Sequence, residues 1–332
     1  MEGDVRTGPD RNLAMELVRT TEYAALACAR WIGRGDKEGA DGAAVDAMRM
    51  LLDTVSMDGV VVIGEGEKDE APMLFNGEHI GDGSAPQADI AVDPLEGTEL
   101  CAKGLPNAIA TIALSERGTM FDPGPCVYML KMATSRDMAH LLDLDRPLGE
   151  TLELMAKEKG VPVNDLVVIM LDRPRHEDAM AEIRAAGARI RLIPHGDVSA
   201  ALAAVTEGSA VDLLYGIGGT PEGVLAAAAI KCTGGQILGR LWPRSDEERN
   251  AALDAGYDLE EVLDRDRLVA GRDVFFAATG VTDGEMLDGV HFTRGGATTE
   301  SVSMRSRSGT VRTITARHDR AKLREIVGER LA

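Results

Sequence analysis

Residues 89–98, with the sequence Asp-Ile-Ala-Val-Asp-Pro-Leu-Glu-Gly-Thr, carry side chains suited to holding a hard metal ion. Asp93 and Glu96 stand three positions apart after a short apolar run, and Thr98 adds a hydroxyl. Mg²⁺ and Mn²⁺ prefer such oxygen ligands and usually keep some water or substrate oxygen. Because Asp, Pro and Gly are also ordinary turn residues, a strand followed by an acidic turn explains the segment equally well.

Four other acidic residues are candidates for the same site, and two of them, Glu65 and Glu67, are alternatives to each other. Glu65 and Glu67 both follow a buried apolar run, and Glu65 is the first choice because it is nearer the run. Asp41 precedes an apolar helical pattern, so its alternative role is to cap that helix. Glu222 follows a proline in a glycine-rich turn, and its alternative role is to interact with the dipole of the helix that begins there.

Basic and glycine-rich turns supply a possible phosphate site. Arg173 and Arg175 flank Pro174, and guanidinium groups bind phosphate with two parallel hydrogen bonds. A solvated surface pair is the alternative for these arginines. Residues 216–223 (Gly-Ile-Gly-Gly-Thr-Pro-Glu-Gly) resemble a phosphate-binding loop, but they lack the Lys-Ser/Thr of a P-loop and the spacing of a dinucleotide fingerprint. His176 and His195 lie in neighbouring turns and are further candidates to contact phosphate.

Three strand–helix pairs are expected to position these turns. The expected strands are 166–171, 189–193 and 211–215, followed by helices at 177–187, 198–206 and 221–232. Successive strand–helix pairs indicate a parallel sheet with helices packed on it. Ligands of such sheets bind beyond the carboxyl ends of the strands. The turns with the arginines, His195 and Glu222 are therefore expected to share one edge of the sheet.

The apolar periodicity predicts the remaining elements. Helices are expected at 12–32, 42–56 and 319–331, and a helical surface excursion at 244–268. Strands are expected at 60–63, 89–92 (ended by Pro94), 107–114, 126–133, 139–144, 273–278, 289–293, 298–305 and 310–316. The organisation changes near 146/147. We therefore expect an N-terminal α+β domain, 1–146, with most metal ligands, and a C-terminal α/β domain, 147–332, with the arginines and Glu222.

The composition excludes several classes of protein. The formal net charge is −19, which disfavours general binding to nucleic acids or to anionic membranes. No stretch approaches the roughly 20 apolar residues of a membrane span. The cysteines have no Cys-x-x-Cys spacing, so we expect buried free thiols in a reducing cytoplasm; they are Cys28, Cys101, Cys126 and Cys232. These features indicate a soluble cytoplasmic protein.

Several motifs, taken in order, resemble those of the bacterial class II fructose-1,6-bisphosphatases. They lie at 33–37, 40–45, 62–67 with 69–73, 93–98, 172–176 and 216–223, and the resemblance runs from about residue 11 to about residue 320. The wider lithium-sensitive phosphatase superfamily shares only the Asp-Pro-x-Asp/Glu-Gly-Thr/Ser core. The resemblance implies an α/β fold, the layered α-β-α-β-α sandwich of sugar phosphatases.

Carried over position by position, the resemblance implies two sets of site residues. The metal ligands, for Mn²⁺ or Mg²⁺, fall on Asp41, Glu65, Asp93, Glu96 and Glu222. The substrate contacts fall on Glu96, Gly97, Thr98, Tyr128, Arg173, Pro174, Arg175, His195, Gly196, Asp197 and Gly219. It is the resemblance, and not the spacing, that favours Glu65 over Glu67. The family usually has Asp-Gly-Asp where this chain has His195-Gly-Asp, which leaves the sugar contact at position 195 open.

The implied activity is hydrolysis of the 1-phosphate of fructose 1,6-bisphosphate in gluconeogenesis. Glu65, Asp93 and Thr98 are the implied catalytic residues, with Glu65 and Thr98 orienting the attacking water. Three alternatives stay open: a bifunctional enzyme that also takes sedoheptulose 1,7-bisphosphate, an enzyme similar to inositol monophosphatase, and a non-catalytic regulator that binds sugar phosphates. The resemblance also implies a homodimer or homotetramer.

Overall fold

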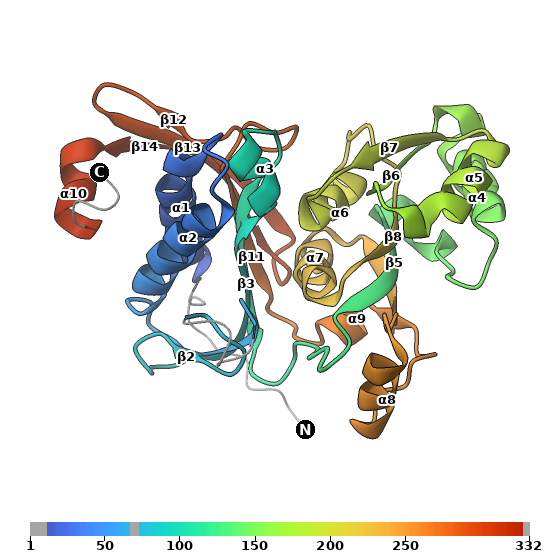
Figure 1. Cartoon of the computed structure of the whole chain (residues 1–332), viewed down its shortest axis with the longest axis horizontal. Helices are drawn as coiled ribbons and strands as arrows, with labels where there is room; N and C mark the ends of the chain where they lie inside the picture. The colour runs from blue at the N-terminus through green and yellow to red at the C-terminus, as the bar shows by residue number, and fades with distance from the viewer. Residues whose placement is uncertain (1–11, 67–72, 328–332) are drawn as a thin grey trace.

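The computed structural model of the chain describes residues 12–66 and 73–327, which fold into five layers (Figure 1). An outer layer of α1 (Ala14–Cys28) and α2 (Lys37–Leu52) covers a first sheet. Helices α6 (Asp197–Val205) and α7 (Thr220–Thr233) separate that sheet from a second one. The far layer holds α4 (Leu148–Lys159) and α5 (Glu177–Ala186). The predicted α-β-α-β-α sandwich is therefore confirmed.

The first sheet combines strands from both ends of the chain. Within the described residues it has eight strands in the order β12-β13-β11-β4-β3-β1-β2, with β14 paired to β13. The pair β1–β3 is parallel, and the other pairs are antiparallel. The strands are β1 (Asp58–Ile63), β2 (His79–Ile80), β3 (Gln87–Glu96), β4 (Ile109–Glu116), β11 (Phe275–Gly280), β12 (His291–Phe292), β13 (Gly296–Arg305) and β14 (Thr310–Asp319).

The second sheet contains the three strand–helix pairs that the sequence predicted. Its six strands in the described part of the chain follow the order β10-β9-β5-β8-β6-β7. Strands β7, β6 and β8 are parallel to one another, as expected, whereas β5, β9 and β10 are antiparallel to their neighbours. The strands are β5 (Tyr128–Thr134), β6 (Val167–Leu171), β7 (Arg189–Ile193), β8 (Leu213–Gly219), β9 (Gln236–Leu241) and β10 (Leu263–Asp264).

The expected boundary at 146/147 does not separate the two sheets. Strand β5 precedes it but lies in the second sheet, and β11 to β14 follow it but lie in the first. The chain crosses between the sheets twice, because β11 has to fill the position between β4 and β13. Spatial neighbours in the first sheet are therefore far apart in the sequence.

Two predicted strands need correction. The strand expected at 139–144 is wrong, because 3₁₀ helix η2 (Arg136–Leu141) occupies its first half and no strand follows in the second half. Both edges of the preceding strand β5 are already paired, and the apolar side chains pack near α4 instead. In the first sheet, Pro94 does not end β3, which continues to Glu96 with a shift of register against β4. The short helix α3 (Thr98–Lys103) follows directly.

Smaller elements complete the described chain. The excursion at 244–268 contains the helices α8 (Asp246–Asp254) and α9 (Arg265–Leu268), and α10 (Arg320–Val327) follows β14. The remaining 3₁₀ turns are η1 (Ala29–Trp31), η3 (Val163–Asp165) and η4 (Pro174–His176). Among the described helices, none combines the length and the apolar character that a membrane span requires.

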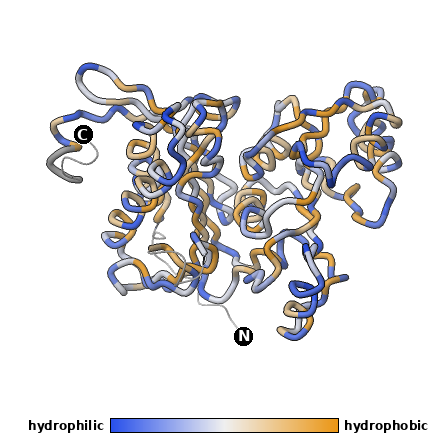
Figure 2. Tube along the Cα trace, in the orientation of Figure 1, coloured by the Kyte–Doolittle hydropathy of each residue, from blue (hydrophilic) through white to orange (hydrophobic). Residues whose placement is uncertain are grey.

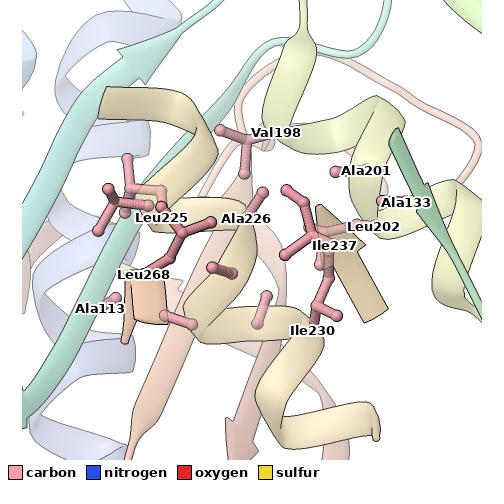
Figure 3. Packing of buried hydrophobic residues seen from close by; sticks show 14 of the residues in the cluster. Ala113, Ala133, Val198, Ala201, Leu202, Leu225, Ala226, Ile230, Ile237 and Leu268 are labelled. Atoms are coloured by element: carbon pink, nitrogen blue, oxygen red, sulfur yellow. The ribbon is translucent and has the colours of Figure 1, made fainter. Parts of the chain in front are cut away.

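Helix α7 is the central element of the core, because it packs against strands of both sheets. Its buried residues include four consecutive alanines, 226–229, together with Val224, Leu225 and Ile230, and Figure 3 shows several of them among side chains of neighbouring elements. Small side chains let a helix fit between two closely spaced sheets. In the described part of the chain, hydrophobic residues are concentrated in the strands and in the helices packed between and beside the sheets (Figure 2). The core thus fixes the position of the first turn of α7, which carries Glu222.

Candidate active site

A cavity of about 620 Å³ brings the predicted site residues together. Of the two sets that the resemblance implies, every residue lines it except Pro174, which is exposed at the start of η4 between the two arginines. One side of the cavity is formed by the ends of β1 and β3 and by α2 and α3, and the other side by the turns of the second sheet. In Figure 1, α3 and the helices α6 and α7 face each other in this region. The cavity therefore has an acidic side and a side that carries the arginines.

The acids of the first sheet meet because β1 and β3 are adjacent and parallel. Their carboxyl ends lie at one edge of the sheet, which places Glu65 next to Asp93 and Glu96. The main chain of Glu65 is fixed by a hydrogen bond from its N–H to the Leu74 carbonyl, 2.9 Å long. The competing Glu67 lies outside the described residues.

The turn at the end of β3 is held by its own side chains. The Asp93 carboxylate accepts a hydrogen bond from the Leu95 N–H at 3.1 Å, and the Thr98 hydroxyl donates to the Leu95 carbonyl at 3.0 Å. Gly97 has a φ of +83°, and a Cβ there would lie 2.9 Å from Leu100 Cδ1. The conformation and the close contact both require glycine at this position. The turn fixes the spacing between the two carboxylates and the hydroxyl.

Asp41 is not the cap of α2. The helix begins at Lys37, and Asp36 is its N-cap residue, with a side chain that accepts the Gly39 N–H at 2.9 Å. Asp41 therefore lies in the second turn, where its side chain lines the cavity.

Glu222 reaches the cavity from the first turn of α7. The N-cap residue of this helix is Gly219, and a Cβ on Gly219 would lie 1.7 Å from Glu222 Oε2. That oxygen is buried and has no hydrogen-bond partner in the described structure. A role in favouring the helix dipole alone does not explain a buried, unpaired oxygen, since a first-turn carboxylate gains that benefit while exposed to water.

The two arginines are held by main-chain carbonyls of neighbouring turns. Arg173 donates to the Pro194 carbonyl at 2.7 Å, and Arg175 donates to the Ile217 carbonyl at 2.8 Å. The guanidinium carbon of Arg175 lies 5.1 Å from the centre of the Tyr128 ring, which also lines the cavity. These contacts join the turns after β6, β7 and β8 into one edge, as the parallel strands predicted.

The two histidines in the turns after β6 and β7, His176 and His195, differ in their surroundings. His176 is buried, and both ring nitrogens are used by the main chain: Nδ1 bonds the Leu171 carbonyl, and Nε2 accepts the Ile217 N–H, each at 2.8 Å. The expectation that His176 contacts phosphate is therefore wrong. His195 lines the cavity, and burial together with the charges of Arg173, Lys37 and Lys103 lowers its pKa.

The acids of the cavity hold their protons strongly. Burial, with smaller contributions from Asp41 and Glu222, raises the pKa of Glu65 to about 8. Burial also raises the pKa of Glu96 to about 8 and that of Asp93 well above its usual value. So many carboxylates in one cavity are stable in charged form only when a cation balances them.

The donor set fits an oxygen-preferring cation in chemistry and charge. Glu96 Oε2, like Glu222 Oε2, is buried without a hydrogen-bond partner in the described structure. Buried, unpaired carboxylate oxygens are suitable ligands for Mg²⁺ or Mn²⁺. In the described ranges, however, no three Asp, Glu, His or Cys side chains are already arranged around a single ion position. The acids therefore suit a cation without forming a complete cage on their own.

Lys37 is a cavity residue that the sequence reasoning did not assign. It begins α2, lines the cavity and forms an ion pair with Glu99 of α3. The signal was present, because Lys37 ends the first of the ordered motifs, Gly-Arg-Gly-Asp-Lys at 33–37.

Comparisons with known proteins identify similar sequences over nearly the whole chain. The model of the family described as "Bacterial fructose-1,6-bisphosphatase, glpX-encoded" matches residues 11–318. "D-fructose 1,6-bisphosphatase class 2/sedoheptulose 1,7-bisphosphatase" of Synechococcus sp. (strain JA-3-3Ab) is 42% identical, over 93% of this chain and 96% of that protein. "Fructose-1,6-bisphosphatase 1 class 2" of Escherichia coli (strain K12) is also 42% identical, over 93% of this chain and 95% of that protein.

One solved structure gives a weaker match. The extragenic suppressor protein suhB from Bartonella henselae is 18% identical, and the match covers 59% of this chain and 74% of that one. Its TM-score is 0.33, so the likeness carries no argument about fold or function.

Proposed function

Because this chain belongs to the bacterial, glpX-encoded family of fructose-1,6-bisphosphatases, we propose that it hydrolyses the 1-phosphate of fructose 1,6-bisphosphate. The products are fructose 6-phosphate and phosphate, and the reaction is a step of gluconeogenesis. One observation carries the proposal: the five acids and the arginine pair line a single cavity. A bisphosphate needs both features, a cation site for the reacting phosphate and fixed positive charge for the second one.

The five acids would hold Mn²⁺ or Mg²⁺; they are Asp41, Glu65, Asp93, Glu96 and Glu222. When bound, such an ion neutralises charge on the transferred phosphoryl group and lowers the pKa of water. The Thr98 hydroxyl donates a hydrogen bond to the Leu95 carbonyl, so the lone pairs of its oxygen are free to accept a hydrogen bond from the attacking water. Glu65, on the adjacent strand end, orients the other proton of that water.

Arg173 and Arg175 would bind the second phosphate. Each is already directed by a main-chain carbonyl, so little side-chain entropy is lost when a phosphate binds. A phosphate held there directs the opposite end of the sugar toward the acids. With this arrangement, a bisphosphate is expected to be a better substrate than a monophosphate such as inositol monophosphate.

A bifunctional enzyme is the second candidate. The Synechococcus relative carries both the fructose and the sedoheptulose bisphosphatase names, and it is as similar to this chain as the Escherichia coli relative. The same cavity residues would serve the longer sugar. A non-catalytic regulator is disfavoured, because such a protein has no need to keep every acid of the cavity.

Phosphate release from a panel of sugar phosphates tests the proposal. The panel comprises fructose 1,6-bisphosphate, sedoheptulose 1,7-bisphosphate, fructose 1-phosphate, fructose 6-phosphate and inositol 1-phosphate, each with Mn²⁺, with Mg²⁺ and with a chelator. We expect the highest kcat/KM for a bisphosphate and no release with the chelator. Release only from inositol 1-phosphate, or no release from any member, would refute it.

Location and assembly are also part of the proposal. All four cysteines are buried and free, as the sequence predicted, which is typical of proteins of the reducing cytoplasm. A homodimer or homotetramer is proposed from the family alone.

A further inference from the structure

Lys131 is the most unusual residue beneath the cavity. It lies in the middle of β5, a central strand of the second sheet, and its side chain is only 2% exposed. Its partners on the two neighbouring strands are Gly216 and Gly239. A charged lysine is rarely buried so completely, because leaving water costs several kcal/mol unless its charge and hydrogen bonds are compensated.

The Lys131 ammonium group connects two turns of the cavity. It forms an ion pair with Asp197, the first residue of α6, and donates to the Gly219 carbonyl at 2.8 Å. Asp197 and Gly219 both line the cavity, whereas Lys131 itself does not. Lys131 can therefore hold a bound substrate in place only indirectly, through these two partners.

The space around this ion pair is closely filled. A Cβ on Gly218 would lie 2.0 Å from Asp197 Oδ2 and 3.1 Å from Lys131 Cε. A Cβ on Gly219, the next residue, would meet Glu222. Strand β8 thus ends in two glycines because the carboxylates of Asp197 and Glu222 occupy the space that a side chain at these positions would fill. Gly219, which Lys131 contacts, is the N-cap residue of the helix whose first turn carries the candidate metal ligand Glu222.

Lys131 places a positive charge next to the acids at one end of the cavity. Its ion-pair partner Asp197 lines the cavity together with Glu96 and Glu222. Burial raises the pKa of both glutamates, and the charge of Lys131 acts against that rise. A fixed positive charge therefore lies at the end of the cavity formed by Glu96, Asp197 and Glu222.

We infer that Lys131 is a positioning residue: its buried ammonium group holds Asp197 and Gly219 in place and acts as a permanent counter-charge for this end of the cavity. The inference rests on the proposed function, since Asp197 and Gly219 serve the reaction only if the cavity is the active site. In this role Lys131 sets the position of the substrate contacts on two different turns. It also limits how strongly cations bind beside Glu222.

A purely structural role is the alternative, and the chain offers a matched control for it. Lys159 forms an ion pair with Asp212, whose side chain is 4% exposed and accepts the Val167 N–H at 2.9 Å. Asp212 precedes β8 at the end opposite to Gly219, and Lys159 ends α4, so this second lysine–aspartate pair lies beside the same sheet but away from the cavity. Lys131→Met and Lys159→Met each leave a buried aspartate without its lysine.

The kinetic test compares both variants at a temperature where both are fully folded, verified by circular dichroism. We expect Lys131→Met to lower kcat for fructose 1,6-bisphosphate at least tenfold and to raise KM, so that kcat/KM falls about 100-fold. Lys159→Met should keep kcat and KM within about twofold, even if it lowers the melting temperature as much. Equal kinetics of the two variants would overturn the inference.

Mn²⁺ binding to the substrate-free protein, followed by electron paramagnetic resonance, gives a second readout. Removing a fixed cation from an acidic site should tighten Mn²⁺ binding severalfold in Lys131→Met, although turnover is slower. A merely loosened site binds Mn²⁺ more weakly, and that result would overturn the counter-charge role.

Failure of the variants to fold, and absence of activity in the wild type, also have defined consequences for the inference. If Lys131→Met does not fold, Lys131→Gln takes its place, because its amide still donates to the Gly219 carbonyl without the charge. Failure of both to fold would mean that Lys131 serves the fold, and the inference would be wrong. If the wild type does not release phosphate from fructose 1,6-bisphosphate, the proposed function fails first, whatever the Mn²⁺ titration shows.

Discussion

Glu96 Oε1 accepts a hydrogen bond of 2.9 Å from the main-chain N–H of Val198. Glu96 ends β3 of the first sheet, and Val198 lies in the first turn of α6, which packs on the second sheet. This bond joins the acidic side of the cavity directly to the turn that carries His195 and Asp197. The other carboxylate oxygen of Glu96 remains buried and unpaired, so one side chain both connects the two halves and offers a ligand atom.

Asp93→Asn should abolish metal-dependent phosphate release and leave the fold intact. Asparagine can keep the hydrogen bond that Asp93 Oδ1 accepts from the Leu95 N–H, but it removes a negative charge from the proposed cation site. We expect a loss of at least about 10³ in kcat/KM, equivalent to roughly 4 kcal/mol. The control is Asp46→Asn, an exposed position on α2 outside the cavity. Near wild-type release from Asp93→Asn would remove this residue from the site.

Arg173→Ala should chiefly raise KM for fructose 1,6-bisphosphate. In the proposed site, Arg173 would contact the distal phosphate in both the ground state and the transition state, so its loss should cost binding more than turnover. A tenfold or larger increase in KM, with kcat changed less than threefold, is the expected result of a steady-state titration. Arg184→Ala, at an exposed position of α5, serves as the control. An unchanged KM would exclude Arg173 from the phosphate site.

Gly219→Ala should lower activity, whereas Gly42→Ala should raise the free energy of unfolding. A Cβ at Gly219 would lie 1.7 Å from Glu222 Oε2, so the carboxylate must move and activity should fall at least tenfold. A Cβ at Gly42, inside α2, meets nothing within 4 Å, and alanine there should stabilise the protein by about 0.5 to 1 kcal/mol. Urea unfolding and phosphate release measure both effects. Full activity in Gly219→Ala would show that the position of Glu222 is unimportant.

Mn²⁺ binding to the metal-free protein should release protons at pH 7. Burial raises the pKa of Glu65 and of Glu96 to about 8, so both are largely protonated at pH 7 and must lose their protons before they bind a cation. The apparent affinity for Mn²⁺ should therefore increase as the pH rises from 6 toward 8. Calorimetric titrations in two buffers with different enthalpies of ionisation count the protons. Identical heats in both buffers would contradict the prediction.

Glu22→Gln should remove part of the pH dependence of stability. Glu22 faces the first sheet from α1, is 6% exposed, and has its pKa raised from 4.5 to about 7, chiefly by burial. A carboxyl whose pKa is raised on folding contributes stability that is complete below the unfolded pKa and is lost as the pH rises through the folded pKa. Between pH 5 and pH 8 the wild type should therefore lose on the order of 2 to 3 kcal/mol relative to Glu22→Gln.

Urea unfolding of both proteins at several pH values tests this expectation, and the difference between them isolates Glu22 from the cavity acids. Parallel curves for the two proteins would show that Glu22 does not titrate in this range.

Much of the candidate site was predictable because its residues follow strand ends. The rule that parallel strands share an edge placed Arg173, Arg175 and Glu222 together, and the structure has them on one cavity. Short apolar runs located β1, β3 and most strands of the second sheet, because strands that are covered on both faces consist largely of buried apolar residues. The position of Glu65 beside Asp93 then follows from the adjacent pairing of β1 and β3.

The remaining features depend on neighbours that lie far away in the sequence. Whether Pro94 ends β3 depends on how β4 accommodates the shifted register between Asp93 and Glu96. Lys131 lies two positions from the buried Met129 and Ala133, so the strand pattern places it on the same buried face. Its partner Asp197, however, comes from another element. The wrong strand at 139–144 shows that a short apolar run does not reveal whether an unpaired strand edge is available.

The return of β11 to the first sheet has a consequence for biosynthesis. The acids at the ends of β1 and β3 are translated early, but the sheet that holds them lacks its central strand until residues 275–280 have left the ribosome. Between the synthesis of β4 and that of β11, which is about half of the chain, the edge of β4 that later pairs with β11 has no partner strand. An unpaired strand edge favours aggregation, so chaperone binding during synthesis would protect the unfinished chain.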